Sequence, residues 1–249
     1  MTFSREILRR FSRELYISGG LSFGSYRLRS GRVSPYYIDL RIAISRPILL
    51  RLSTGLLVET ISRIEPRPTK ICGIPMSGAI LASALSATSG VAGLYIRKEP
   101  MIYRELAEKI EILEKRCPEA VREILGEVRS KAHGISRMVD GILEDGDRVL
   151  LVDDVITTGE TKLEAIEIVR EEARRRGIRV DVIGVAVLID REEGGSRELA
   201  LKGYRVYSAS SIREIMGALH EEGLIDRSSV EAIESYIEAV SHEGKTSTG

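Results

Sequence analysis

VLLVDDVITTGET, residues 149–161, joins an apolar run to two adjacent acids, Asp153 and Asp154, and then to a Thr-Thr-Gly turn. Neighbouring carboxylates repel each other, and each is costly to bury. A strand end that caps a helix is the plain alternative, but one Asp would be enough for that. We therefore interpret the acids and the turn together as a binding surface at the carboxyl end of a strand.

Three kinds of phosphate-containing ligand fit a strand that ends in this way. A nucleoside triphosphatase needs a G-x-x-x-x-G-K-[ST] loop, but Ala239 replaces the first glycine before EGKT (243–246). A dinucleotide site needs G-x-G-x-x-G after a strand, which the sequence lacks. A helix start after TTGET (157–161) offers N–H groups to a phosphate, and two acids can accept hydrogen bonds from neighbouring hydroxyls. The pattern therefore favours a sugar phosphate.

Short apolar runs alternate with helical patterns along the rest of the chain. Continuous apolar runs are typical of parallel strands buried on both faces, and they occur at 71–74, 93–96, 148–154 and 180–190, with a weaker one at 204–210. Helical spacing occurs at 3–17, 46–64, 78–89, 160–176, 212–219 and 228–241, and a hairpin is expected within 18–41. Residues 99–130 interrupt one strand–helix unit, and the spacing of their apolar residues predicts two amphipathic helices joined near Pro118. The expected fold class is α/β.

Composition narrows the function further. The chain has 249 residues with 37 basic and 37 acidic side chains, so it lacks the charge excess of a general nucleic-acid binder. Cys72 and Cys117 match no metal or redox spacing, which suits thiols in a reducing cytoplasm. The absence of Asn and Gln suggests a thermophile. The uncharged stretch 73–96 contains too many glycines and hydroxyl residues for a membrane span, so we expect a soluble protein.

Residues 149–161 resemble the phosphoribosyl-pyrophosphate (PRPP) signature of type I phosphoribosyltransferases. Four further segments are similar to the orotate phosphoribosyltransferase family: FGSYRLRSGRVSPYYIDLR (23–41), GIPMSGAILA (73–82), YIRKE (95–99) with KAHG (131–134), and LIDREEGG (188–195). The resemblance implies a single domain over 1–249, with a parallel sheet flanked by helices. Its expected parts are a small N-terminal hood at about 1–45, a core at about 46–210, a helical insertion at about 99–130, and C-terminal helices at about 211–243. The insertion separates YIRKE from KAHG, which lie close together in the family.

The resemblance also implies the reaction and the residues that carry it. Phosphoribose would pass from PRPP to orotate, giving orotidine 5'-monophosphate and pyrophosphate in pyrimidine nucleotide biosynthesis. The residues implied for PRPP are Arg29, Met76, Ser77, Gly78, Arg97, Lys98, Asp153, Asp154, Thr157, Thr158, Gly159 and Thr161. Those implied for orotate are Tyr36, Tyr37, Thr157 and Arg191, and those implied for catalysis are Lys131, His133, Asp153 and Asp154.

An oxocarbenium-like transition state is implied, so the cations of the loop would neutralise the departing pyrophosphate. Mg²⁺ is the implied cofactor, held mainly by PRPP and water and not by protein ligands. A cytoplasmic homodimer with shared active sites is expected, with no nucleic acid or membrane as partner. A fused orotidylate decarboxylase is not expected, because it would need another barrel-sized domain. Two other functions stay open: transfer to another base, against which SPYY (34–37) and DREEGG (190–195) argue, and a non-catalytic PRPP-sensing regulator.

Overall fold

A six-stranded sheet forms the centre of the computed structural model, which describes residues 2–27, 31–98 and 137–246. Its strand order is β5-β4-β3-β6-β7-β8. The strands are β3 (Lys70–Gly73), β4 (Ala92–Ile96), β5 (Val139–Asp140), β6 (Asp147–Ile156), β7 (Val180–Asp190) and β8 (Val206–Ser211). All neighbours are parallel except β5, which runs antiparallel to β4. The α/β fold with a mostly parallel sheet is therefore confirmed.

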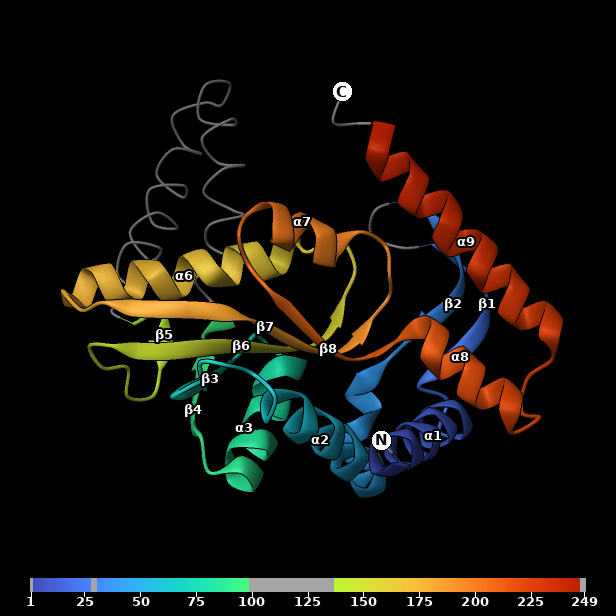
Figure 1. Ribbon diagram of the computed structural model, residues 1–249, viewed down its shortest axis with the longest axis horizontal. Coiled ribbons are helices and arrows are strands. Elements are labelled where there is room, and N and C mark those ends of the chain that lie inside the picture. The colour runs from blue at the N-terminus through green and yellow to red at the C-terminus, as the bar shows by residue number, and fades with distance from the viewer. Residues whose placement is uncertain (1, 28–30, 99–136, 247–249) are drawn as a thin grey trace, which may run out of the picture.

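Helices cover both faces of this sheet (Figure 1). On one face lie α6 (Glu160–Arg176) and α7 (Gly195–Leu201), and on the other lie α2 (Pro47–Ile61) and α3 (Ser77–Ser89). Successive residues of β6 point to opposite faces. Leu150 and Val152 therefore enter the core beneath α2 and α3, whereas Val149 and Leu151 enter the core beneath α6. Two covered faces explain why the central strands are continuously apolar.

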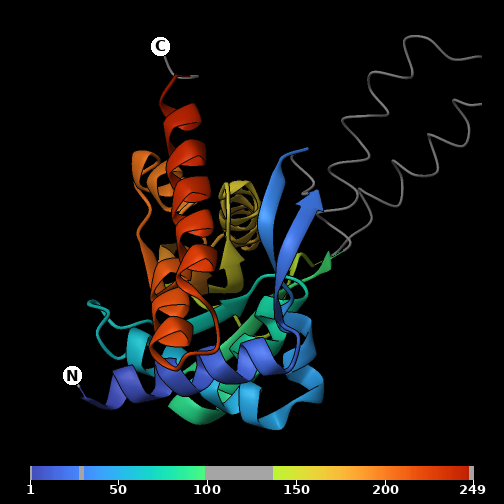
Figure 2. The same ribbon diagram turned by 90° about the vertical axis from the view of Figure 1, so that its right-hand side faces the viewer.

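The two ends of the chain pack together beside the sheet (Figure 2). The N-terminal elements are α1 (Thr2–Ile17), β1 (Leu21–Arg27), β2 (Val33–Ile38) and the 3-10 helix η1 (Leu40–Ser45). The C-terminal ones are α8 (Ile212–Glu221) and α9 (Arg227–Thr246). Strands β1 and β2 form an antiparallel hairpin. Phe11, Leu21 and Tyr36 belong to the same buried cluster as Leu150, so the hairpin extends the core of the sheet.

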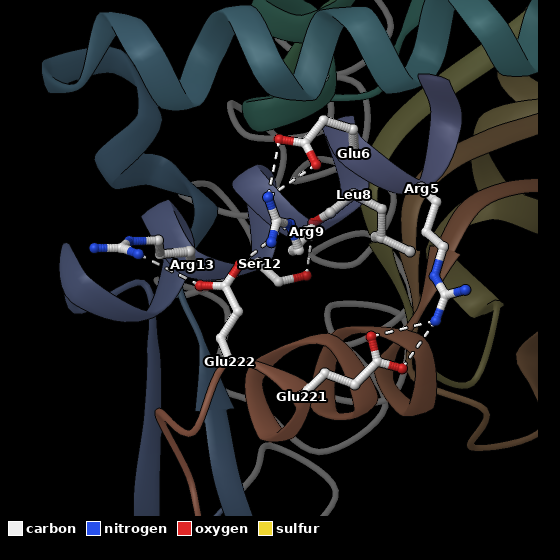
Figure 3. A network of polar contacts seen from close by, with 8 residues as sticks. All are labelled: Arg5, Glu6, Leu8, Arg9, Ser12, Arg13, Glu221 and Glu222. Atoms are coloured by element: carbon white, nitrogen blue, oxygen red, sulfur yellow. Dashed lines mark hydrogen bonds and ion pairs between the residues drawn. The ribbon is translucent and has the colours of Figure 1, made fainter. Parts of the chain in front are cut away.

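Ion pairs join α1 to the end of α8 (Figure 3). Arg5 lies 3.0 Å from Glu221, and Arg9 and Arg13 each lie 3.5 Å from Glu222. Arginine side chains exposed in this way contribute only about 0–1 kcal/mol each. The apolar stripe of α1, which is fully buried at Phe11 and Leu15, therefore provides most of the attachment.

The predicted helices and strands within the described residues are confirmed, with the 160–176 helix matching at both ends. Three short elements were not predicted: η1, β5 and α7. The two helices expected within 99–130 lie outside the described residues. No helix in the described part of the chain is long and apolar enough to cross a membrane.

Candidate active site

The loop between β6 and α6 forms a tight turn at Gly159. Its φ of +88° is in the left-handed region, and a Cβ there would lie 2.5 Å from Leu199 Cδ1. The turn is tied to the start of α7, where Gly195 N donates to Thr157 O at 2.8 Å. Thr157 is half-buried, and Thr158 is exposed. Lys162 N donates to Gly159 O at 3.0 Å. The first N–H groups of a helix have no partner further back in the helix, so the start of α6 can receive an anion.

The two adjacent acids have different surroundings. Asp153 is buried, and its Oδ2 lies 2.7 Å from Lys162 Nζ. Its Oδ1 accepts from Asp154 N at 2.9 Å, and Lys162 also donates to Val155 O at 2.6 Å. Burial raises the pKa of Asp153 to about 7, although the Lys162 ammonium acts in the opposite direction. Both oxygens of Asp153 are therefore engaged inside the protein.

Asp154 is half-buried and lines a hollow of about 200 Å³. The hollow is shared by Met76 and Ser77 at the start of α3 and by Arg41 of η1. Asp154 Oδ1 accepts from Val155 N at 2.8 Å. Arg41 is ion-paired with Asp39 at 2.7 Å, and its hydrogen bond lowers the pKa of Asp39. Asp154 is thus the acid of the pair that borders open space.

The segment between β3 and α3 lies against the same strand end. Ile74 N donates to Val152 O at 2.9 Å, and the Pro75–Met76 peptide bond is cis. A Cβ on Gly78 would overlap Val152 O and lie 3.0 Å from Asp153 Oδ1. Only glycine allows α3 to begin this close to the acids. Met76 is 63% exposed and Ser77 is half-buried, so the loop faces outward beside Asp154.

Two basic residues follow β4 next to this loop. Arg97 and Lys98 line a hollow of about 510 Å³ together with Pro75, Met76 and Asp140. Arg97 N donates to Met138 O at 3.0 Å, which fixes the backbone at the end of the strand. The structure therefore places the GIPMSG loop and the Arg-Lys pair around the same hollow.

Arg191, at the end of β7, lies under the N-terminal hairpin and is only 4% exposed. Its guanidinium stacks over the Tyr36 ring at 4.4 Å from the centroid, and its Nη2 lies 2.7 Å from Glu193 Oε1. Nη2 also donates to Ser34 Oγ at 3.2 Å. Burial raises the pKa of Tyr36, so its hydroxyl stays protonated. Tyr37 is 39% exposed.

The structure brings several of the predicted site residues together at one end of the sheet. Residues 76–78, 97–98, 153–154 and 157–161 surround the carboxyl ends of β3, β4 and β6, while Arg191 and Tyr36 lie at β7. Arg29, Lys131 and His133 lie outside the described residues. Sequence reasoning missed Lys162 and Glu193. A lysine in the first turn of a helix, where acids are favoured, was the available signal for Lys162.

Among the described residues, no group of three His, Cys, Asp or Glu side chains is arranged to hold a metal ion. Asp154 is the one acid of the pair with access to a hollow, and a carboxylate oxygen is a ligand type that Mg²⁺ accepts. The residues present thus fit an ion that brings most of its ligands with it.

Comparison with known proteins agrees with this geometry. The family model "Phosphoribosyl transferase domain" matches residues 43–208. An orotate phosphoribosyltransferase of Staphylothermus marinus is 31% identical over 240 residues, covering 96% of this chain and 98% of the relative. This chain belongs to the orotate phosphoribosyltransferase family.

A crystal structure of an orotate phosphoribosyltransferase from Aeropyrum pernix matches this family member with a TM-score of 0.60 and 26% identity, covering 87% of this chain and 99% of that one. The uridine 5'-monophosphate synthase of Bos taurus is 28% identical over 224 residues. The match covers 90% of this chain but only 39% of the bovine protein, so the chain spans well under half of that relative.

Proposed function

We propose that this protein transfers phosphoribose from PRPP to orotate, forming orotidine 5'-monophosphate and pyrophosphate. One observation carries the proposal beyond family membership: Asp154 borders a hollow that it shares with Met76 and Ser77 of the GIPMSG loop, and the Thr-Gly turn follows Asp154 at the end of the same strand. A ligand with a phosphate, a diol and a pyrophosphate needs these three features side by side. Relatives whose names state this activity cover most of the chain.

The 5-phosphate is assigned to residues 157–161 at the start of α6. The N–H groups at the start of the helix and the helix dipole favour an anion there. We assign the ribose hydroxyls to Asp154. Asp153 supports Asp154, because its Oδ1 accepts from Asp154 N and its Oδ2 is paired with Lys162.

The leaving pyrophosphate is assigned to the backbone of residues 76–78 and to the cations at Arg97 and Lys98. Negative charge grows on this group as the anomeric bond breaks, so cations fixed beside it stabilise the transition state more than the substrate. Lys131 and His133 are proposed to add to this charge. Bound Mg²⁺ would supply further neutralisation of the pyrophosphate, and Asp154, which shares a hollow with Met76 and Ser77, would be a carboxylate available to it.

The base is assigned to the region around Arg191 and the backbone of Tyr36 and Tyr37. Orotate is already an anion, so the reaction needs little help from a general base. Positioning of the base over the anomeric carbon and stabilisation of pyrophosphate then account for most of the rate.

Pyrophosphate release from PRPP, measured with a panel of bases, tests the proposal. Orotate should be the preferred base, and Asp154→Asn should lower kcat/KM by about 100-fold or more because a group acting in the transition state is lost. Asp181→Asn is the matched control, since Asp181 is exposed at the opposite end of β7. Preference for a different base, or PRPP binding without turnover of any base, would contradict the orotate assignment.

We also propose a cytoplasmic homodimer in which the hood and the core act as one domain. The shared cluster of Phe11, Tyr36 and Leu150 supports the single domain. Mixing Lys131→Ala subunits with Asp154→Asn subunits tests the dimer, because shared sites would restore part of the activity. A mixture as inactive as its components would rule out either shared sites or the role of Lys131.

A further inference from the structure

The Arg191 side chain sits in a buried polar cluster drawn from three distant parts of the chain. Ser34 and Tyr36 come from β2, Glu193 follows β7, and Tyr236 lies in α9. Ser34 and Tyr36 are fully buried, and Arg191 and Glu193 are 4% and 8% exposed. Buried ionic groups are costly unless they are paired and hydrogen-bonded. The cluster must therefore be internally satisfied.

A single oxygen of Glu193 holds this cluster together. Glu193 Oε1 accepts from Arg191 Nε at 2.8 Å and lies 2.7 Å from Arg191 Nη2. The hydroxyls of Tyr36 and Tyr236 both donate to the same oxygen at 3.4 Å. The rings of these two tyrosines meet edge to face, with centroids 6.1 Å apart. Arg191 is thus held in its plane by Tyr36 and in its orientation by Glu193.

We infer that Glu193 and Tyr236 are positioning residues that fix Arg191 for recognition of the base. Glu193 accepts a hydrogen bond from Arg191 Nε, and Ser34 accepts one from Arg191 Nη2. We assign the remaining edge, which carries Nη1, to an oxygen of the base. A guanidinium held on two sides loses little freedom when a ligand binds the third, so the cluster improves affinity by preorganisation. The base-binding half of this inference rests on the proposed function.

Helix α9 is part of this arrangement, although it lies near the opposite end of the chain from β2. It rises beside the β1–β2 hairpin (Figure 2), and Ile233 and Ile237 pack into the core on either side of Tyr236. Those contacts fix the position of the Tyr236 hydroxyl over Glu193. The last helix therefore determines how firmly Arg191 is held.

Two variants test the inference through their separate effects on the KM for orotate and the KM for PRPP. Glu193→Gln removes the charge that orients Arg191 and should raise the KM for orotate about tenfold or more, while the KM for PRPP stays within about twofold. Tyr236→Phe removes only one hydroxyl and should raise the orotate KM about threefold. Glu192→Gln and Tyr204→Phe are matched controls, since Glu192 pairs with Arg213 and the Tyr204 ring lies under Arg170.

A double-mutant cycle shows whether Glu193 acts through Arg191. In an Arg191→Ala background, Glu193→Gln should cause no further rise in the orotate KM. Equal rises of the two KM values, or an unchanged orotate KM in both variants, would overturn the inference. A further rise in the Arg191→Ala background would also overturn it.

A second readout does not depend on turnover. The Arg191 Nε–H proton is buried and bonded to Glu193, so NMR should show that it exchanges slowly with water. Both variants should accelerate that exchange. If the wild-type protein does not use orotate but shows this protection and its loss, the proposed function fails while the positioning of Arg191 stands. If the exchange is unchanged in both variants, Glu193 and Tyr236 do not hold Arg191.

Discussion

The buried pair of Asp153 and Lys162 allows a quantitative test by Lys162→Met. The two side chains are 9% and 8% exposed and lie 2.7 Å apart. Burial raises the pKa of Asp153 to about 7 even with the ammonium in place. Methionine keeps the length of the lysine stem but removes the charge, so the pKa of Asp153 must rise further.

The effect of the change depends on pH, and its sign follows from proton linkage. An acid whose pKa is raised by folding stabilises the folded state fully below its unfolded pKa of about 3.9, and that stability is lost as pH rises to the folded pKa. In the wild-type protein the loss ends near pH 7, where Asp153 ionises beside Lys162. In Lys162→Met the folded state keeps its proton above pH 7 and loses about 1.4 kcal/mol for each further unit.

Urea unfolding followed by circular dichroism at two pH values measures this loss. At pH 5.5 Asp153 is protonated in both folded states, so the variant should lose only the other contacts of Lys162, such as its hydrogen bond to Val155 O. At pH 8.5 the loss of stability should be larger than at pH 5.5 by about 2 kcal/mol, which is 1.4 kcal/mol over about one and a half pH units. Lys202→Met, which changes an exposed lysine, is the control and should show no such difference.

A destabilisation of equal size at both pH values would refute this reasoning, because it would show that the charge of Lys162 does not act on Asp153. Adding Asp153→Asn to Lys162→Met should remove the pH dependence. Persistence of the pH dependence in the double variant would mean that another group titrates.

Three further changes test parts of the fold that position the site. Gly78→Ala should lower kcat/KM for PRPP and cost about 1–3 kcal/mol of stability, because the new Cβ would overlap Val152 O and α3 would have to shift. Unaltered PRPP kinetics would contradict the close approach of α3 to β6. Glu172→Gln should lower the free energy of unfolding in urea by about 1–3 kcal/mol, since Glu172 is buried and accepts from Arg176 Nε at 2.6 Å. An unchanged free energy of unfolding would show that this ion pair does not stabilise the fold. Leu150→Ala should cost about 2–5 kcal/mol in the same assay, because Leu150 is fully buried in the sheet; a loss below 1 kcal/mol would contradict the packing.

The elements that sequence reasoning predicted are those with a strong local pattern. The runs at 148–154 and 180–190 are continuously apolar because both faces of the sheet are covered, and the 160–176 helix begins after Gly159 and ends before Gly177 in its left-handed C-cap. In contrast, β5 has only two residues and no period to recognise. Its position depends on pairing with β4 and on Glu172, which accepts from Met138 N at 2.9 Å.

The candidate site was predicted by residue type but not by partner. The sequence placed Asp153 and Asp154 together as ligands for hydroxyls, whereas the structure buries the first against Lys162, nine positions further on. The turn at Gly159 creates that contact, and spacing alone does not reveal it. Arg191 was likewise assigned to the base without Glu193, because a two-residue separation does not predict that Nε and Nη2 of Arg191 both contact Glu193 Oε1.

The order in which the chain is synthesised determines when the cluster around Arg191 can form. Residues 149–161 leave the ribosome well before Tyr236, and structure forms from the N-terminus as synthesis proceeds. The turn at 157–161 therefore has all of its residues before Tyr236, whose hydroxyl donates to Glu193, has been synthesised. A translation product that stops within α9 before Tyr236 would retain the turn but lack this contact. If the proposed function holds, such a product is expected to discriminate less between bases and still to bind PRPP.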